Sequence, residues 1–141
     1  MPEGSALEPA IQRWLADPES DVEYAELVED RWAVRMVQTV RDATTVWWRV
    51  GTYTISVEAY VLPSPPGDAD GVHRLAMRRN LDSWRCHFAL DSEGAVVIRG
   101  RVPFNATFDE LDALLGEIYQ MVEMSFRPMV RLGFGGREKR P

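Results

Sequence analysis

This chain of 141 residues has little of the side-chain chemistry on which catalytic and metal sites usually depend. A single cysteine, Cys86, excludes an intrachain disulfide, and nothing suggests an oxidising compartment. The two histidines, His73 and His87, show no metal-ligand spacing. The glycines near the C-terminus follow no junction from a strand to a helix, so they do not form a phosphate-binding loop. We therefore expect neither a metal nor another cofactor.

Long apolar runs are also missing. No stretch approaches the ~18 residues needed to cross a bilayer. The N-terminal region lacks the basic start and the apolar core of a signal peptide. We expect a soluble, cytoplasmic protein without membrane contacts. The length favours a single domain over residues 1–134, followed by a mobile basic tail over residues 135–141.

Charge is negative overall, at −6, and unevenly distributed. Residues 1–30 carry nine acidic side chains against Arg13 alone, whereas the remaining 111 residues carry fifteen basic and thirteen acidic ones. The acidic segment is either a solvated surface or a segment that covers the basic body of the protein or meets a basic partner. The net charge disfavours general binding of nucleic acid or anionic membranes.

The strongest secondary-structure signal lies in residues 46–62, which are rich in β-branched and aromatic residues. From residue 53 onward the pattern alternates with a period of two, as in a strand with one face on a core. The predicted core face holds Tyr53, Ile55, Val57, Ala59 and Val61. Residues 46–50 alternate in a second phase, and Gly51 between the two strands permits a tight turn. We predict a central β-hairpin.

Further patterns complete the expected fold. Capping boxes open the first and third helices, Asn80 is suited to cap the second, and Pro128 is expected to end the third. Residues 18–30 are weakly periodic, so we predict a loop there. The predicted elements are helices over 5–16, 72–81 and 107–127, and strands over 32–39, 46–50, 53–62, 84–90 and 96–102. This order implies a two-layer α+β domain, with a mainly antiparallel five-stranded sheet and helices on one face.

Cys86 and His87 together suggest a nucleophile and its base. Neighbouring residues of a strand point to opposite faces, however, so these side chains cannot act on one atom. Cys86 shares its phase with Trp84 and Phe88, which predicts a buried thiol. The acids at the start of the third helix stabilise the helix dipole: Asp109, Glu110 and Asp112. We predict a protein that is not an enzyme, with an enzyme using these groups as an alternative.

Two patterns favour another alternative, a regulator that binds anions or nucleic acid. The first is an arginine patch on the predicted second helix, formed by Arg74, Arg78 and Arg79. A solvated helix face is the simpler interpretation of this patch. The second is the mixture of aromatic and basic residues on the sheet at Trp47, Arg49 and Tyr60, which is typical of RNA-binding sheets. The acidic composition argues against it.

The sheet face that points away from the helices should be polar, yet it carries large apolar groups. A partner subunit, a segment of a target protein or the N-terminal arm would cover them. Isolated exposed apolar residues are also ordinary on protein surfaces. We predict that a protein partner binds on this face, at Val37, Trp47, Arg49, Tyr60 and Val97.

Several short motifs stand in order between residues 7 and 134. They are ISVEAYV at 55–61, RRNL at 78–81, FALD at 88–91 with Gly94, GRVP at 100–103, the helix start at 107–115, and RLGF at 131–134. In this order and spacing the chain resembles the YbjN family. The arginine-rich composition, with Lys139 as the single lysine, suits the actinobacterial branch of that family.

The resemblance implies an α-β-β-β-α-β-β-α domain similar to type III secretion chaperones, often dimeric and without known catalytic residues. Members of the family are described as candidate sensory-transduction regulators, and the related chaperones bind extended segments of client proteins. We therefore expect a regulatory or chaperone-like module that binds a protein partner, which includes a second copy of itself.

Overall fold

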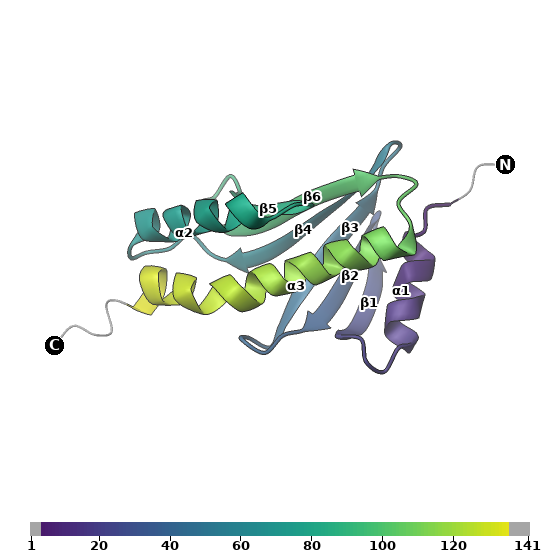
Figure 1. Cartoon of the computed structure of the whole chain (residues 1–141), viewed down its shortest axis with the longest axis horizontal. Coiled ribbons are helices and arrows are strands. Elements are labelled where there is room, and N and C mark those ends of the chain that lie inside the picture. The colour runs from purple at the N-terminus through teal and green to yellow at the C-terminus, as the bar shows by residue number, and fades with distance from the viewer. Residues whose placement is uncertain (1–3, 136–141) are drawn as a thin grey trace.

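In a computed structural model, which describes residues 4–135, three helices pack on a six-stranded antiparallel sheet (Figure 1). The elements are α1 (Leu7–Ala16), β1 (Val22–Val28), β2 (Arg31–Val37), β3 (Ala43–Val50), β4 (Thr54–Leu62), α2 (Ala69–Asp82), β5 (Cys86–Leu90), β6 (Val96–Pro103), α3 (Phe108–Val130) and the π-helical turn η1 (Arg131–Gly135). The strand order is β1-β2-β3-β4-β6-β5. The predicted α+β class is confirmed. The predicted mobile tail lies outside the described residues, apart from Gly135.

The sheet has six strands rather than the expected five, because residues 22–28, predicted to be a loop, form β1. β1 is an edge strand that pairs only with β2, and its register shifts between Val22 and Tyr24. Only Val22 of this strand is buried. An edge strand with little burial lacks the alternation by which a half-buried strand is detected. Its pairing with β2, the ion pair between Glu23 and Arg35 and the burial of Val22 hold it in place.

The predicted central hairpin is confirmed in β3 and β4. Trp48 lies opposite Val57, and Val46 lies opposite Ala59, so these four side chains share the buried face. At the turn, the backbone N–H of Gly51 donates to the carbonyl of Thr54 at 2.8 Å. Tyr53 was expected in the core but is exposed, since β4 begins one residue later and Tyr53 belongs to the turn.

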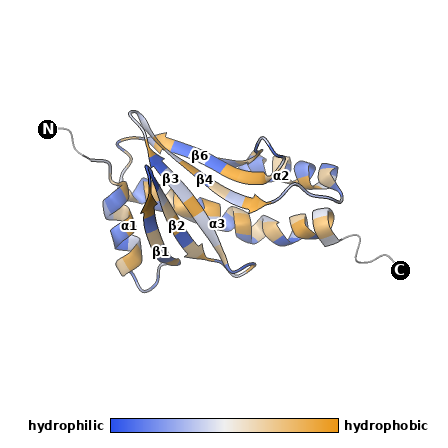
Figure 2. Cartoon of the chain, turned by 180° about the vertical axis from the view of Figure 1, so that it is seen from behind, coloured by the Kyte–Doolittle hydropathy of each residue, from blue (hydrophilic) through white to orange (hydrophobic). Residues whose placement is uncertain are grey.

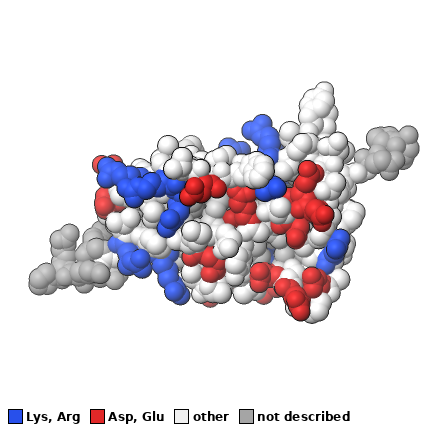
Figure 3. All heavy atoms as spheres, in the orientation of Figure 1, with Lys and Arg blue, Asp and Glu red and all other residues white. Residues whose placement is uncertain are grey.

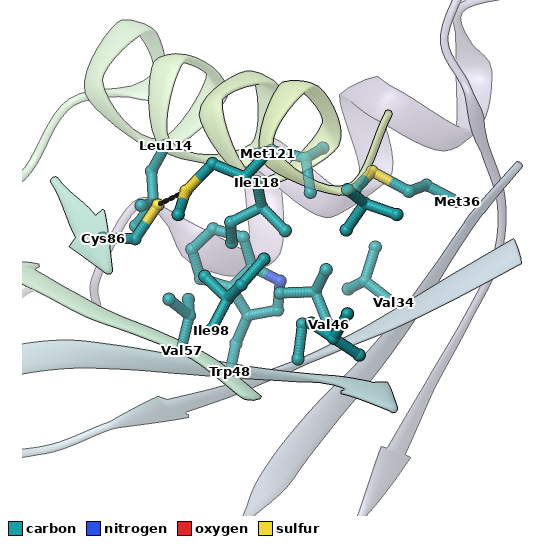
Figure 4. Close-up of a cluster of buried hydrophobic side chains, with 14 of the residues drawn as sticks. Val34, Met36, Val46, Trp48, Val57, Cys86, Ile98, Leu114, Ile118 and Met121 are labelled. Atoms are coloured by element: carbon teal, nitrogen blue, oxygen red, sulfur yellow. Dashed lines mark hydrogen bonds between the residues drawn. The ribbon is translucent and has the colours of Figure 1, made fainter. Parts of the chain in front are cut away.

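The core lies between α3 and the inner face of the sheet, with Trp48 at its centre (Figure 4). The Trp48 ring faces Leu114 and Ile118 of α3, all of them buried. α1 closes the β1 end of the core, where the rings of Trp14 and Trp48 lie 5.7 Å apart. Burial of this many large apolar side chains is the main stabilising term for the fold.

The two predicted capping boxes have different outcomes. At α3 the Thr107 hydroxyl accepts from the Glu110 N–H (3.3 Å), and the Glu110 carboxylate accepts from the Thr107 N–H (2.8 Å). At α1 the box predicted from Ser5 does not form, because the helix begins one residue later, after Ala6. The Ser5 hydroxyl accepts instead from the N–H of Leu7 at 3.2 Å. Only α3 has the reciprocal cap.

Pro128 does not end α3, which continues to Val130 and then into η1. A proline inside a helix leaves the carbonyl four residues earlier without its donor. That carbonyl belongs to Met124, and the guanidinium of Arg79 from α2 donates to it at 3.4 Å. A side chain of the neighbouring helix therefore replaces the lost backbone bond. Although α3 has 23 residues, no helix within residues 4–135 is long and apolar enough to cross a membrane.

Asn80 does not cap α2, because the helix continues to Asp82. Its side-chain amide donates to the carbonyl of Phe88 at 3.1 Å and accepts from the N–H of Phe88 at 2.7 Å. The Asn80 side chain thus joins α2 to β5, with the same pair of hydrogen bonds that a neighbouring strand would make to Phe88. The predicted cap is wrong because the Asn80 side chain bonds to β5 and not to the end of its own helix.

Candidate interaction surfaces

The residues considered for catalysis are used in packing and capping. Cys86 is buried on the inner face of β5, with its sulfur 3.4 Å from that of Met121 (Figure 4). His87 lies on the outer face, opposite Arg99. Burial and the nearby Glu117 carboxylate raise the pKa of the Cys86 thiol to about 12. The thiol is therefore protonated and a poor nucleophile at neutral pH. The prediction of a buried cysteine is confirmed.

The acidic cluster at the start of α3 is likewise structural. Glu110 completes the helix cap, and the Asp112 carboxylate accepts a hydrogen bond from the indole N–H of Trp14 at 2.8 Å. This bond ties α1 to α3. Among residues 4–135, no group of three His, Cys, Asp or Glu side chains is placed to hold a metal ion.

On the outer face of the sheet, which points away from the helices, the strand register aligns residues in rows that cross several strands. Figure 2 views the sheet from this side. In one row Arg31 of β2 lies opposite Arg49 of β3, Arg49 lies opposite Ser56 of β4, and Ser56 lies opposite Arg101 of β6. Three of these four positions are arginines. The sheet therefore brings together basic residues that are up to 70 positions apart in the sequence.

The next row on the same face combines an aromatic ring with both signs of charge. It runs from Trp47 of β3 to Glu58 of β4, Arg99 of β6 and His87 of β5. The guanidinium of Arg31 lies over the Trp47 ring, 4.4 Å from its centroid. Such a cation–π contact holds both groups in place and leaves guanidinium N–H groups available to a ligand.

Two shallow hollows lie between these rows, and both include Ser56 and Arg99. One, of about 340 Å3, extends over Trp47 and Arg31, and the other, of about 350 Å3, extends over His87 and Arg101. We call this region the arginine face, defined as Arg31, Trp47, Arg49, Ser56, Glu58, His87, Arg99 and Arg101.

The arginine face has more positive than negative charge, although the protein as a whole is acidic. Arg49 pairs with Asp30 at 3.3 Å. Among the residues that the structure describes, no carboxylate lies within ion-pair distance of Arg31, Arg99 or Arg101. Four arginines thus face two carboxylates, those of Asp30 and Glu58, so the face has an excess of two positive charges.

The predicted partner-binding residues occupy outer-face positions of their strands, but only two of them belong to the arginine face. Trp47 and Arg49 belong to the arginine face, and Tyr60 is 51% exposed at the other end of β4. Val37 is exposed at the end of β2, away from the arginines. Val97 is only 2% exposed and offers no contact area, which corrects its predicted role. The sequence placed it on the correct face, but alternation does not show how far neighbouring side chains cover a residue.

A second surface, on the helix side, was not predicted. Met77 and Leu81 lie one turn apart on α2, and Trp84 follows the helix; all three are exposed, Leu81 by 84% and Trp84 by 77%. A groove of about 420 Å3 between α2 and α3 is lined by Trp84, Met121 and Met124. We call this groove, with these three residues, the α2–α3 groove.

Trp84 was expected on the core face of its strand, in phase with Cys86. β5 begins only at Cys86, and the carboxylate of Glu117 on α3 accepts hydrogen bonds from the N–H groups of Trp84 (2.6 Å) and Arg85 (3.1 Å). These bonds fix the loop before the strand so that the Trp84 ring faces solvent. The helical spacing of Met77 and Leu81 with Trp84 was the signal in the sequence that could have indicated these exposed apolar residues.

The predicted arginine patch on α2 is divided. Arg74 and Arg78 are exposed, but Arg79 is directed into the fold, where it donates to the Ser125 hydroxyl at 3.2 Å and to the Met124 carbonyl. On this side of the molecule most basic side chains lie over α2 and the C-terminal part of α3, and many acidic ones lie toward α1 (Figure 3). The three arginines therefore do not form one anion site.

Comparison with models of protein families identifies the family of this chain. The model of the family YbjN, described as "Putative bacterial sensory transduction regulator", matches residues 10–130. The chain belongs to the YbjN family. The matched segment includes every strand and both surfaces described above, so the resemblance seen in the sequence is confirmed. The family description supports a regulatory role and names no partner.

Curated relatives of this YbjN-family chain are themselves uncharacterized. Proteins of Mycobacterium leprae and of Mycobacterium tuberculosis H37Rv are each 31% identical to it over 86 residues. The aligned segment covers 60% of this chain and 47% of each relative. The chain thus spans about half the length of the curated relatives that it matches.

Proposed function

We propose that this YbjN-family chain is a non-catalytic, regulatory or chaperone-like module that acts in the cytoplasm and binds a protein partner through the outer face of its sheet. The observation that carries the proposal is Trp47, a half-buried ring beside available arginines on an antiparallel sheet face. Tryptophan, tyrosine and arginine are the residues most enriched at the energetic centres of protein interfaces.

The construction of the sheet supports this role. Trp47 lies next to Trp48 on β3. Because the Trp48 ring is fully buried against α3, the core holds the backbone that presents Trp47 in place. A surface held in this way loses little conformational entropy when a partner binds. Regulatory proteins that act by binding need no reactive group, which agrees with the structural use of Cys86 and of the acidic cluster.

The test is affinity capture of native complexes followed by mass spectrometry, with the wild-type chain and with Trp47→Ala and Tyr60→Ala. We expect both substitutions to remove the same partner proteins, because they truncate rings on the proposed contact face. Tyr53→Ala is the matched control, since Tyr53 is an exposed aromatic at the turn between β3 and β4. Retention of every partner by both variants would contradict the proposal.

The partner in this proposal includes a second copy of the chain. Light scattering over a range of concentrations distinguishes the two cases. A dimer that Trp47→Ala converts to a monomer identifies the outer face as the self-interface. A strict monomer, together with unchanged captured partners, would reject the proposed function altogether.

A further inference from the structure

We infer that the partner segment bound by the arginine face is an acidic, extended peptide, whose aspartate or glutamate carboxylates pair with Arg31, Arg99 and Arg101. This inference rests on the proposed function and names the chemistry of the partner. Charge complementarity carries it, because these guanidiniums form no ion pair with the carboxylates of residues 4–135.

Like charges lie close together on this face, even though Asp30 pairs with Arg49 and Glu58 lies opposite Arg99. Arg31 and Arg49 are directly opposite each other on adjacent strands, where like charges destabilise a sheet. Arg99 and Arg101 are two residues apart on β6, so they project from the same face. A carboxylate placed between two guanidiniums replaces this repulsion with two charge-assisted hydrogen bonds. Binding of an acidic segment therefore gains energy that a neutral segment would not.

The spacing fits an extended chain. Arg49 and Arg101 occupy strands that are two positions apart in the sheet, with Ser56 between them, a separation of about 10 Å. Successive side chains of an extended peptide point to opposite sides, so residues two positions apart face the same surface, about 7 Å from each other. Acidic residues at alternate positions would therefore meet the two arginine groups, whose long side chains reach across the remaining distance, while the peptide backbone passes over uncharged Ser56.

A peptide fits this face better than a nucleic acid. Glu58 lies in the same row between Trp47 and Arg99, and its carboxylate would repel a phosphate that passes over it. A peptide can place a neutral or donor side chain at that point, whereas a nucleic-acid backbone carries a charge at every nucleotide. The net charge of −6 further opposes a long polyanion.

The experiment measures fluorescence anisotropy with three labelled probes. The first is a peptide of alternating glutamate and serine of roughly ten residues, enough to cross four strands. The second is the same peptide with glutamine for glutamate, and the third is an oligothymidylate of similar length. We expect the glutamate peptide to bind most tightly and to lose affinity as salt is raised, because the contacts are exposed ion pairs.

Matched variants locate the binding. Arg99→Gln with Arg101→Gln should weaken binding of the glutamate peptide roughly tenfold, since two screened ion pairs are lost. Arg74→Gln with Arg78→Gln makes the same charge change on the exposed surface of α2 and should leave the affinity within about twofold. Thermal unfolding of both double variants checks that the fold is intact. An equal loss in the two pairs would show a non-specific charge effect and overturn the inference.

The other outcomes are equally decisive. If the glutamine peptide binds as tightly as the glutamate peptide, carboxylates are not what the face recognises, and the inference is wrong. Tighter binding of the oligothymidylate, lost in the Arg99/Arg101 variant, assigns the face to nucleic acid instead. If no probe binds while captured partners still depend on Trp47, the inference fails and the proposed function stands. If captured partners do not depend on Trp47 or Tyr60, the proposed function itself fails.

Discussion

The two faces of the sheet differ most clearly at two neighbouring tryptophans. Trp48 is completely buried under α3, whereas Trp47 is partly exposed beneath the guanidinium of Arg31. The inner face is apolar and excludes water, so it determines stability. The outer face carries arginines, three of which form no ion pair among the described residues, so it contributes less to stability.

The α2–α3 groove adds a third kind of surface. It is apolar, with exposed methionine and tryptophan side chains, and the arginine face is polar and basic. Methionine-rich surfaces adapt to varied apolar partners, whereas arginine arrays select carboxylates by geometry. The groove lies between two helices and the arginine face on the strands, and Arg85 lines both the groove and the hollow beside His87.

The largest expected contrast is in stability. Trp48→Ala should lower the free energy of unfolding by about 3–5 kcal/mol, because it opens a cavity beneath α3. Trp47→Ala should cost no more than about 1 kcal/mol, since its ring is half-solvated. Urea denaturation followed by far-ultraviolet circular dichroism measures both. Similar losses would break the distinction between the two faces.

Thiol reactivity gives the second contrast, between residues 86 and 87. Native Cys86 should react with a disulfide reagent at pH 8 only when the protein opens, because it is buried and its pKa is raised to about 12. A cysteine introduced on the outer face by His87→Cys, in a Cys86→Ala background, should react at least about a hundredfold faster. Fast reaction of native Cys86 would contradict the burial described here, and unfolded protein serves as the reference.

Two arginines provide a third contrast. Arg79→Gln should cost about 1–2 kcal/mol of stability, because it removes the donor to the Met124 carbonyl that Pro128 leaves unpaired. Arg99→Gln should change stability by less than about 0.5 kcal/mol, since Arg99 has no ion-pair partner among the described residues. Thermal unfolding of the two variants tests this. A larger loss for Arg99→Gln would show that the arginine face supports the fold.

The smallest expected effect is on the melting temperature at acidic pH. Burial alone would raise the pKa of Glu123 on α3, but hydrogen bonds from Thr39 and from the Gln38 amide (2.7 Å) more than offset it, so this pKa lies below its usual value. A carboxyl group whose pKa is lowered by folding stabilises the protein at pH values above its pKa in the unfolded chain, about 4.3. This stabilisation is lost as the pH falls through the pKa in the folded protein. Glu123→Gln should therefore flatten the fall in melting temperature below about pH 4.3. Glu93→Gln, in the exposed hairpin loop, should leave the fall unchanged.

Local patterns predicted the parts of the fold that depend on local chemistry. The alternation in residues 46–62 predicted the hairpin of β3 and β4, and the T-x-x-E box predicted the start of α3. The failures share a cause, since each depends on contacts between distant residues. β1 is held by pairing with β2, Pro128 is accommodated by Arg79, and Trp84 is turned outward by bonds to Glu117.

The sequence by itself determined which residues of each strand share a face, because alternation is a property of the backbone over two residues. It thereby placed Trp47 and Arg49 on the outer face. Only the tertiary structure decided which strands are neighbours. The pairing of β6 with β4 brings Arg99 and Arg101 beside Arg31 and Arg49, and such pairing depends on long-range packing of the core that no local pattern encodes.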